Sequence, residues 1–359
     1  MNLLRTSEQN DLADAVRALL AADSPASRVR EIADDPGTAF DPRLWGRLSG
    51  DLGVTGLLVA EEHGGAGAGL GEVAVVMEEL GSSLAPLPYL ASAILSAGAI
   101  GRLSGPETAA RLLPGIAAGT TVATLALPSA PAPAATATGL LSGTLPNVAF
   151  GLQADLILVP AVRDGEPLLF AVEAGAPGLT RTPLTGLDPT ASQARVVLDG
   201  TPGTLIGPAG DALAPVLDLA AVALAAEQLG VMRRCLTAIV DYAKIRVQFG
   251  RFIGSFQGVK HRLADMHCTL EQAESIVRYA AWAADHDPAE LPVAAALAQS
   301  YVGPAAFEIA RDHLLLHGGI GFTWEHDAHL YFKRAKAAQH LLGPTRVHRA
   351  RLAAGLGLA

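Results

Sequence analysis

The chain has 359 residues, half of them apolar, and carries a formal net charge of −9. This length suffices for two or three domains with ample core material. Lysine and arginine are scattered along the chain and form no basic stripe, which argues against a nucleic-acid partner. The two cysteines, Cys235 and Cys268, form no CxxC motif, and histidines are not clustered at metal-ligand spacing. We therefore expect neither a disulfide framework nor a zinc site, and interpret both cysteines as small buried apolar residues.

The apolar stretches of the chain do not indicate export or membrane insertion. The segment from Met1 to Glu8 lacks the apolar stretch of a signal peptide. The two most apolar windows are residues 86–100, which include Gly and Ser, and 213–232, which include Asp218 and Glu227. We predict no membrane span and a cytoplasmic protein.

Residues 1–115 are predicted to be helical. After Ser7 and Glu8, apolar residues recur at helical spacing up to residue 20, and a second such run covers residues 41–52. A glycine-rich loop at residues 63–71 follows. It has neither the GxGxxG nor the GxxxxGK[ST] spacing, so we predict a turn into a helix at 72–80 and not a phosphate cradle.

The composition changes between residues 116 and 208. Short β-prone runs, separated by Pro and Gly, lie at 121–127, 156–159, 168–172 and 195–198. They predict a small antiparallel β domain, with a loop at residues 129–138.

From residue 211 onward long helices are predicted, at 214–247, 256–284, 291–316 and 325–341. Joined by short links, they indicate an antiparallel four-helix bundle. The expected fold class is α+β, mainly α, with an N-terminal helical domain (1–115), a middle β domain (116–208) and a C-terminal helical bundle (209–359). The basic group Lys333, Arg334 and Lys336 is predicted to be a solvated helix face and not a phosphate site.

Three stretches resemble the acyl-CoA dehydrogenase family. They are the segment Arg246–Gln257, read RVQFGRFIGSFQ and continuing to Met266, the glycine turn His317–Phe322, and the stretch from Trp45 to Gly81. The order of helices, strands and helices also matches, so the resemblance covers most of the chain and implies an acyl-CoA dehydrogenase-like fold.

The resemblance implies a chemistry and a set of partners. The family oxidises the α–β bond of an acyl-CoA thioester: a glutamate removes the α-proton while a hydride leaves the β-carbon for FAD. Electrons then pass to an electron-transferring flavoprotein. Members are generally tetrameric, and a neighbouring subunit holds the adenine end of FAD. Carried onto this chain, the cofactor-binding candidates are Arg246, Gln248, Phe249, Phe256, Gln257, Gly318 and Gly319.

Each candidate also has a plainer interpretation. A guanidinium at Arg246 offers fixed donors to a pyrophosphate, but it equally suits a surface ion pair. The two Phe side chains are suited to packing against a cofactor ring or to the core, and the two Gln side chains to the cofactor or to solvent. Gly318 and Gly319 permit backbone N–H groups close to a phosphate, or simply join two helices. His317 beside them is interpreted as structural.

The chain departs from the family where the catalytic base belongs. Leu342 occupies the usual glutamate position and Ala220 the alternative one, so no catalytic residue is predicted. Glu227 lies two helical turns from Ala220, roughly 10 Å away, too far to replace it, and Glu325 is interpreted as part of a helix start. Ala221 replaces an arginine on the CoA side, and Leu315 a glutamine that contacts FAD. The flavin-facing segments read instead Pro128–Pro133 and Pro146–Ala149.

Three hypotheses follow. The first is a non-catalytic subunit of a heteromeric (α2β2) acyl-CoA dehydrogenase, as in bacterial members that act on steroid side chains. Such a subunit would share FAD with a partner that carries the catalytic glutamate. The second is a self-sufficient flavin dehydrogenase with a relocated base. The third is a non-enzymatic scaffold or acyl-CoA-binding protein. General-base catalysis contributes typically ~10²–10⁴-fold, so a site with Leu342 and Ala220 alone should be nearly silent.

Overall fold

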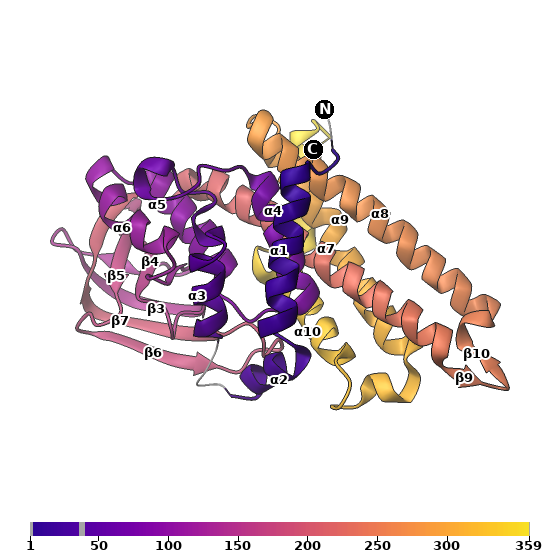
Figure 1. The fold of residues 1–359 in the computed structure, drawn as a ribbon. Coiled ribbons are helices and arrows are strands. Elements are labelled where there is room, and N and C mark those ends of the chain that lie inside the picture. The colour runs from indigo at the N-terminus through magenta and orange to yellow at the C-terminus, as the bar shows by residue number, and fades with distance from the viewer. Residues whose placement is uncertain (1–2, 36–39, 359) are drawn as a thin grey trace. The chain divides into compact units, whose positions relative to one another are not determined.

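The computed structural model describes residues 3–35 and 40–358 of the chain, which form two compact units. The first unit comprises the described parts of 1–27, 70–85 and 221–359, and the second those of 28–69 and 86–220. Helices dominate the first unit, and the second combines a sheet with shorter helices (Figure 1). The mainly α, α+β fold class is confirmed, whereas the predicted domain boundaries near residues 115 and 208 stay a prediction.

The first unit is a helical bundle with a short hairpin and two 3₁₀ turns. Its helices are α1 (Ser7–Asp23), α4 (Leu70–Ser83), α7 (Ala214–Ile245, beginning in the second unit), α8 (Gln257–His286), α9 (Leu291–Leu316), α10 (Ala328–Leu341) and α11 (Thr345–Gly355). Strands β9 (Val247–Gln248) and β10 (Arg251–Phe252) form a hairpin, followed by the 3₁₀ turn η5 (Ile253–Ser255), and η6 (Gly318–Phe322) follows α9.

The predicted long helices are confirmed within a few residues, and α9 matches its predicted range. Helix α10 begins at Ala328, three residues later than predicted, so Glu325 precedes it. Helix α11 was not predicted, because its polar sequence shows little helical periodicity. Only one helical stretch in the described residues, Gly210–Ile245, is long and apolar enough to cross a membrane, and most of it is buried inside the protein, as expected of a core helix.

The first turn of α4 is capped by a residue far away in the sequence. The backbone N–H groups of Leu70 and Gly71 donate to the Asp285 carboxylate on α8, at 2.6 and 2.9 Å. A protein carboxylate therefore already satisfies two of the N–H groups that a helix leaves free at its start. This agrees with the prediction that the preceding glycine-rich loop is a turn and not a phosphate cradle.

Replacing Asp285 with Ala should lower the free energy of unfolding by about 1 kcal/mol, the usual cost of losing such a cap. Urea denaturation followed by circular dichroism measures this loss. The Asp11→Ala variant, which removes an exposed aspartate from α1, is the control and should change stability by less than about 0.5 kcal/mol. A loss for Asp285→Ala no larger than that of the control would refute the capping role.

The second unit is built on an eight-stranded sheet. The strands are β1 (Ala123–Leu125), β2 (Ala134–Ala135), β3 (Leu140–Ala149), β4 (Leu156–Arg163), β5 (Glu166–Glu173), β6 (Leu179–Leu184), β7 (Gln193–Pro202) and β8 (Thr204–Pro208). Their order is β6-β7-β3-β2-β4-β5-β8, with β1 paired to β4. The pairs β1–β4 and β2–β4 are parallel, so the prediction of an antiparallel domain was wrong: the sheet is mixed.

Apolar side chains from β3, β4, β5 and β7 form the core of this unit, among them Leu141, Ile157, Phe170 and Val196. Its helices are α2 (Ala26–Asp34), α3 (Pro42–Gly50), the π-helix η3 (Leu90–Ser96), α5 (Ala97–Leu103) and α6 (Pro106–Ala117), with short turns η1 (Val54–Gly56), η2 (Glu61–His63) and η4 (Gly210–Leu213). Cys268 on α8 is exposed, which corrects the prediction that both cysteines are buried; Cys235 on α7 is buried, and both are free.

Candidate functional site

A tight hairpin after α7 carries two of the predicted cofactor residues, Gln248 and Phe249. Gln248 pairs with Arg251 across a two-residue turn of Phe249 and Gly250. Both turn residues have positive φ, +52° and +74°, the backbone form that suits a two-residue hairpin. Glycine adopts it freely, whereas an aromatic residue there is strained by about 1–3 kcal/mol. Such strain is typical of a residue kept for its function.

Arg246 lies at the base of this hairpin. Its backbone N–H donates to the Tyr242 carbonyl (2.9 Å) and its carbonyl accepts from Ile253 N–H (2.8 Å), so the backbone is held on both sides. Its side chain is exposed and forms no ion pair or hydrogen bond with any residue that the structure describes. The alternative interpretation, a surface ion pair within the chain, therefore finds no partner here.

The two aromatic candidates lie side by side. The Phe249 ring is 93% exposed, which corrects the alternative of a core residue, and its centroid lies 6.3 Å from that of Phe256, edge to face. Phe256 is half-buried and its ring is covered by the Arg251 guanidinium, 3.9 Å from the ring centroid. Phe249 thus offers an open aromatic face, while one face of Phe256 is already occupied.

The two glutamine candidates make only local bonds. Gln248 Nε2 donates to the Val247 carbonyl (2.9 Å), and Gln257 Nε2 lies 3.4 Å from His261 Nε2. Both residues are exposed. Their amide groups therefore remain accessible at the hairpin and at the first turn of α8.

The glycine turn lies beside the last turns of α7. Gly318 has φ of +68°, and a Cβ at Gly318 or Gly319 would meet no atom within 4 Å, so both backbones face open space. His317 anchors the turn: its ring packs in a tilted arrangement against Tyr242 of α7, with 4.5 Å between the ring centroids, and its Nδ1 lies 2.7 Å from the His313 carbonyl oxygen. The hairpin base and the glycine turn are thus brought to the same end of the first unit.

Three histidines form a packed cluster under the glycine turn. The rings of His313, His317 and His326 lie 4.3–6.2 Å apart, centroid to centroid. Burial lowers the pKa of His317, and burial together with the neighbouring positive groups lowers the pKa of His313 to about 3. Among the described residues no group of three or more His, Cys, Asp or Glu side chains is arranged to hold a metal ion. The cluster has the character of a structural core. Sequence reasoning missed it because helix spacing alone does not bring His326 to His313.

The two positions at which the resemblance predicts a catalytic base carry hydrocarbon side chains. Leu342 is the C-terminal cap residue of α10 and is half-buried. Its carbonyl oxygen lies 3.1 Å from His348 Nε2. Ala220 is fully buried in α7 within the second unit. Neither side chain can take up a proton.

Glu227, the carboxylate considered as an alternative base, is already engaged. Glu227 of α7 accepts a hydrogen bond from Arg334 of α10, and both side chains are largely buried. This corrects the prediction of a solvated basic face at residues 333–336, because Arg334 is buried. The Nζ of Lys333 lies 4.4 Å from the centroid of the Trp324 ring, and that of Lys336 lies 4.8 Å from the centroid of Phe307. The partners of these three residues lie on other elements, which sequence spacing did not reveal.

Comparison with known proteins gives two family matches. The C-terminal domain of acyl-CoA dehydrogenases matches residues 211–357 and the N-terminal domain matches residues 6–120. The chain belongs to the acyl-CoA dehydrogenase family. It is 36% identical over 346 residues to the acyl-CoA dehydrogenase IpdE2 of Mycobacterium tuberculosis, covering 94% of each chain.

Two solved heteromeric assemblies of this family contain similar chains. A chain of the ChsE4-ChsE5 complex of Mycobacterium tuberculosis superposes with a TM-score of 0.92 at 31% identity, covering 100% of both chains. A chain of the Tcur3481-Tcur3483 steroid acyl-CoA dehydrogenase G363A variant superposes with a TM-score of 0.89 at 32% identity, covering 98% of both.

Homologues in this family bind FAD. A dinucleotide pyrophosphate needs a cation and approachable backbone N–H groups. The unpaired Arg246 and the open turn of Gly318 and Gly319 fit that need, and the exposed Phe249 ring fits an adenine face.

Proposed function

We propose that this chain is the non-catalytic subunit of a heteromeric, FAD-dependent acyl-CoA dehydrogenase. In this proposal it supplies Arg246, Gln248, Phe249, Phe256, Gln257, Gly318 and Gly319 to the adenine half of an FAD shared with a catalytic partner. The observation that carries the proposal is a contrast within one chain: Arg246 is exposed and unpaired among the described residues, whereas Leu342 and Ala220 have no proton-accepting atom.

The Glu227–Arg334 pair weakens the hypothesis of a relocated base. A carboxylate held by a buried guanidinium is stabilised in its charged form and is a poor proton acceptor. Moving it toward a substrate would also leave Arg334 buried without its partner, which is costly. The partner subunit therefore supplies the glutamate that removes the α-proton, and FAD, when bound, accepts the hydride.

The similar assemblies support a proposal for the substrate class and for the partners. One of them is described as a steroid acyl-CoA dehydrogenase and both contain two different chains. We infer an acyl-CoA substrate of lipid or steroid catabolism, a cytoplasmic α2β2 heterotetramer with a second family member, and an electron-transferring flavoprotein as electron acceptor. A partner chain with the catalytic glutamate intact is required.

Replacing Arg246 with Ala in the co-expressed complex should lower the FAD retained after gel filtration by about tenfold. A charge-assisted hydrogen bond contributes about 1.5–3 kcal/mol, enough for that loss. Flavin absorbance per mole of complex measures it, and complex assembly should persist. The Lys244→Ala variant removes a neighbouring exposed cation that pairs with Asp241 and is the matched control.

The same purification tests the proposal as a whole. The chain expressed alone should carry little FAD and should not oxidise acyl-CoA thioesters. Stoichiometric FAD and turnover by the isolated chain would refute the dependent-subunit role. Unchanged flavin content in the Arg246→Ala complex would instead favour a scaffold that does not touch the cofactor.

A further inference from the structure

A pocket with a volume of about 410 Å³ lies in the first unit beside the start of α1. Residues 3–9, the first half of α4, the last turns of α8 and one residue of α7 line it, and we call it the α4–α8 pocket. Its apolar wall consists of the buried side chains of Ala74, Val75, Leu229, Val277 and Ala281. Pockets of ~300–1,000 Å³ with an apolar wall and a few polar groups are typical of small-molecule sites.

The α4–α8 pocket is remote from the proposed cofactor site of the same unit. On α8 its lining begins at Val277, twenty residues after Gln257, where the helix leaves the hairpin, so the separation is roughly 30 Å. On α7 its lining residue Leu229 precedes Tyr242, which packs on His317, by thirteen residues or roughly 20 Å. Figure 1 shows the β9–β10 hairpin and the start of α1 at opposite ends of α8.

Both carboxylates that line the α4–α8 pocket are already engaged. Glu78 Oε1 accepts from Arg233 Nε at 2.8 Å, and Glu78 Oε2 accepts from Arg5. Each oxygen of the Asp285 carboxylate accepts from a backbone N–H group of α4, at 2.6 and 2.9 Å. No carboxylate oxygen in this lining is therefore without a hydrogen bond.

The donors in the same lining exceed the acceptors. Arg5 donates through one terminal nitrogen only, and Arg278 donates to Glu274 through Nε and Nη2, so Arg278 Nη1 makes no bond to a described residue. The indole Nε1–H of Trp282 makes none either. A guanidinium carries five N–H donors. The surplus of donors suits a ligand with a negatively charged oxygen group, because charge-assisted hydrogen bonds are the strongest that such donors form.

A stacked pair of rings lies beside these donors. The rings of Trp282 and His286 are parallel within 6°, with 5.5 Å between their centroids. His286 Nδ1 lies 3.1 Å from the Trp282 carbonyl oxygen, which leaves Nε2 to become a further donor when the ring is protonated. The pair thus adds a flat apolar surface to the pocket and no further carboxylate.

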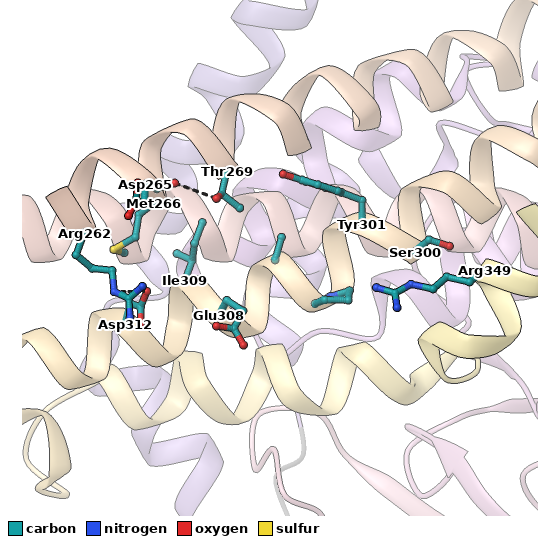
Figure 2. Close-up of a pocket in the computed structure, with 12 residues that line it drawn as sticks. Arg262, Asp265, Met266, Thr269, Ser300, Tyr301, Glu308, Ile309, Asp312 and Arg349 are labelled. Carbon is teal, nitrogen blue, oxygen red and sulfur yellow. Dashed lines mark hydrogen bonds and ion pairs between the residues drawn. The ribbon is translucent and has the colours of Figure 1, made fainter.

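A second pocket of the first unit, lined by α8, α9 and α11, has no such surplus of donors (Figure 2). Asp265 presents a carboxylate there that makes no bond to a described residue, and the Arg349 guanidinium likewise makes none. An open acceptor and an open donor in one pocket do not select a negative charge. The α4–α8 pocket differs because its carboxylates are occupied while its guanidinium groups are not.

We propose that the α4–α8 pocket binds a small amphipathic anion. Its carboxylate or phosphate group accepts from Arg5, Arg278 Nη1 and Trp282 Nε1, and its apolar body lies against the wall formed by α4, α7 and α8. This binding requires neither FAD nor a catalytic partner.

Titration calorimetry on the full-length chain tests the site with two anionic probes, octanoate and octyl phosphate, and the uncharged probe octanol. Both anions should bind, and the tighter one identifies the preferred head group. Octanol should bind at least about tenfold more weakly, because it cannot form charge-assisted hydrogen bonds. Octanol binding as tight as that of both anions would overturn the proposal.

Variants of Arg278 test which donors hold the anion. Arg278→Gln should raise the Kd of the anionic probes about tenfold, and Arg278→Lys, which keeps the charge, should recover part of that loss. Glu274 keeps Arg233 as a partner at 2.8 Å in both variants, and circular dichroism verifies the fold. Arg346→Gln removes an exposed arginine of α11 outside the pocket and is the matched control. An Arg278→Gln variant that binds as tightly as this control would refute the role of Arg278.

Tryptophan fluorescence tests the location of the bound probe independently of affinity. The chain has three tryptophans, and of these only Trp282 lines the α4–α8 pocket. Octanoate should change the fluorescence of the unmodified chain, and Trp282→Phe should abolish this change and weaken binding about threefold. A fluorescence change that survives in Trp282→Phe would place the probe elsewhere and overturn the proposal. The proposed function is unaffected by that result, because it is judged by the flavin content of the complex.

Discussion

The Gly230→Ala variant is expected to lose about 3 kcal/mol of stability, at the upper end of what overpacking usually costs. Helices α4 and α7 cross with their backbones almost in contact. A Cβ at Gly230 would lie 1.9 Å from the Glu78 carbonyl oxygen and 2.8 Å from Ser82 N, and one at Gly81 would lie 2.0 Å from the Glu227 carbonyl oxygen. Backbone atoms cannot rotate aside as a side chain does, so the helices would have to separate.

Separation of α4 and α7 would also disturb the polar bonds on either side of the crossing. Arg233 of α7 donates to the buried Glu78 carboxylate at 2.8 Å, and Tyr331 of α10 donates to the Ser82 carbonyl at 2.9 Å. Alanine has the better helix propensity by about 1 kcal/mol, so any net loss understates the steric cost.

Urea denaturation with circular dichroism gives the free energy of unfolding for this comparison. Gly258→Ala is the control, since Gly258 lies in the first turn of α8 and a Cβ there meets nothing within 4 Å. We expect this variant to be neutral or slightly stabilised. A Gly230→Ala variant within 1 kcal/mol of the unmodified chain would show that the crossing is looser than described.

Stability is expected to fall steeply as pH decreases below about 6.5, because His313 is buried without a hydrogen bond for either ring nitrogen among the described residues. The groups that face it are His317, His326, Tyr331 and Arg234. Burial first, and then the charges of His317, His326 and Arg234, lower its pKa from 6.5 to about 3. Between these two values the unfolded chain binds a proton that the folded chain does not.

The direction in which stability changes with pH follows from this difference in bound protons. Because the unfolded state holds the extra proton between pH 6.5 and pH 3, stability rises with pH across that window and is lost as the pH falls. One such group changes the free energy of unfolding by about 1.4 kcal/mol per pH unit, or about 2 kcal/mol between pH 6.5 and 5. The lowered pKa of His317 acts in the same direction.

The His313→Leu variant isolates this contribution. It removes the titrating ring and both unpartnered nitrogens, so unfolding free energies measured from pH 7 to 5 should lose about one proton of pH dependence. His267→Leu, on the exposed surface of α8, is the control and should leave the slope unchanged. An unchanged slope in His313→Leu would mean that the cluster takes up a proton without unfolding.

The sequence was most informative where the residue type alone decides whether a side chain can perform a given chemical role. Leu342 and Ala220 lack a proton-accepting side-chain atom in any fold, so the prediction that neither acts as a base needed no coordinates. Helix α9 was predicted over its observed range because its apolar residues recur without interruption up to the glycine turn. The predicted β-prone runs 156–159 and 168–172 lie within β4 and β5. The structure joins these two strands by an Asp164-Gly165 turn, which has the positive φ values that this pair favours.

Strand β3 shows where local reasoning failed. It spans Leu140–Ala149 but contains Gly143 and Pro146, both of which weaken a strand signal, and its pairing with β7 is irregular at both places. The local sequence of β3 does not favour a strand, but hydrogen bonds to β7 stabilise the extended conformation. The parallel pairing of β4 with β1 and β2 likewise depends on which strands meet in the sheet. The alternation of apolar and polar residues within one strand does not specify its neighbours.

The sequence by itself determined the family, the order of helices and strands, and the hydrocarbon side chains at positions 220 and 342. These features depend on residue identity and on spacing within one element. Only the tertiary structure decided that Arg246 is left unpaired among the described residues and that Glu227 is held by Arg334. Ion pairs and hydrogen bonds here join residues more than a hundred positions apart, such as Glu78 with Arg233 and Leu70 with Asp285, and their energies depend on distance in space.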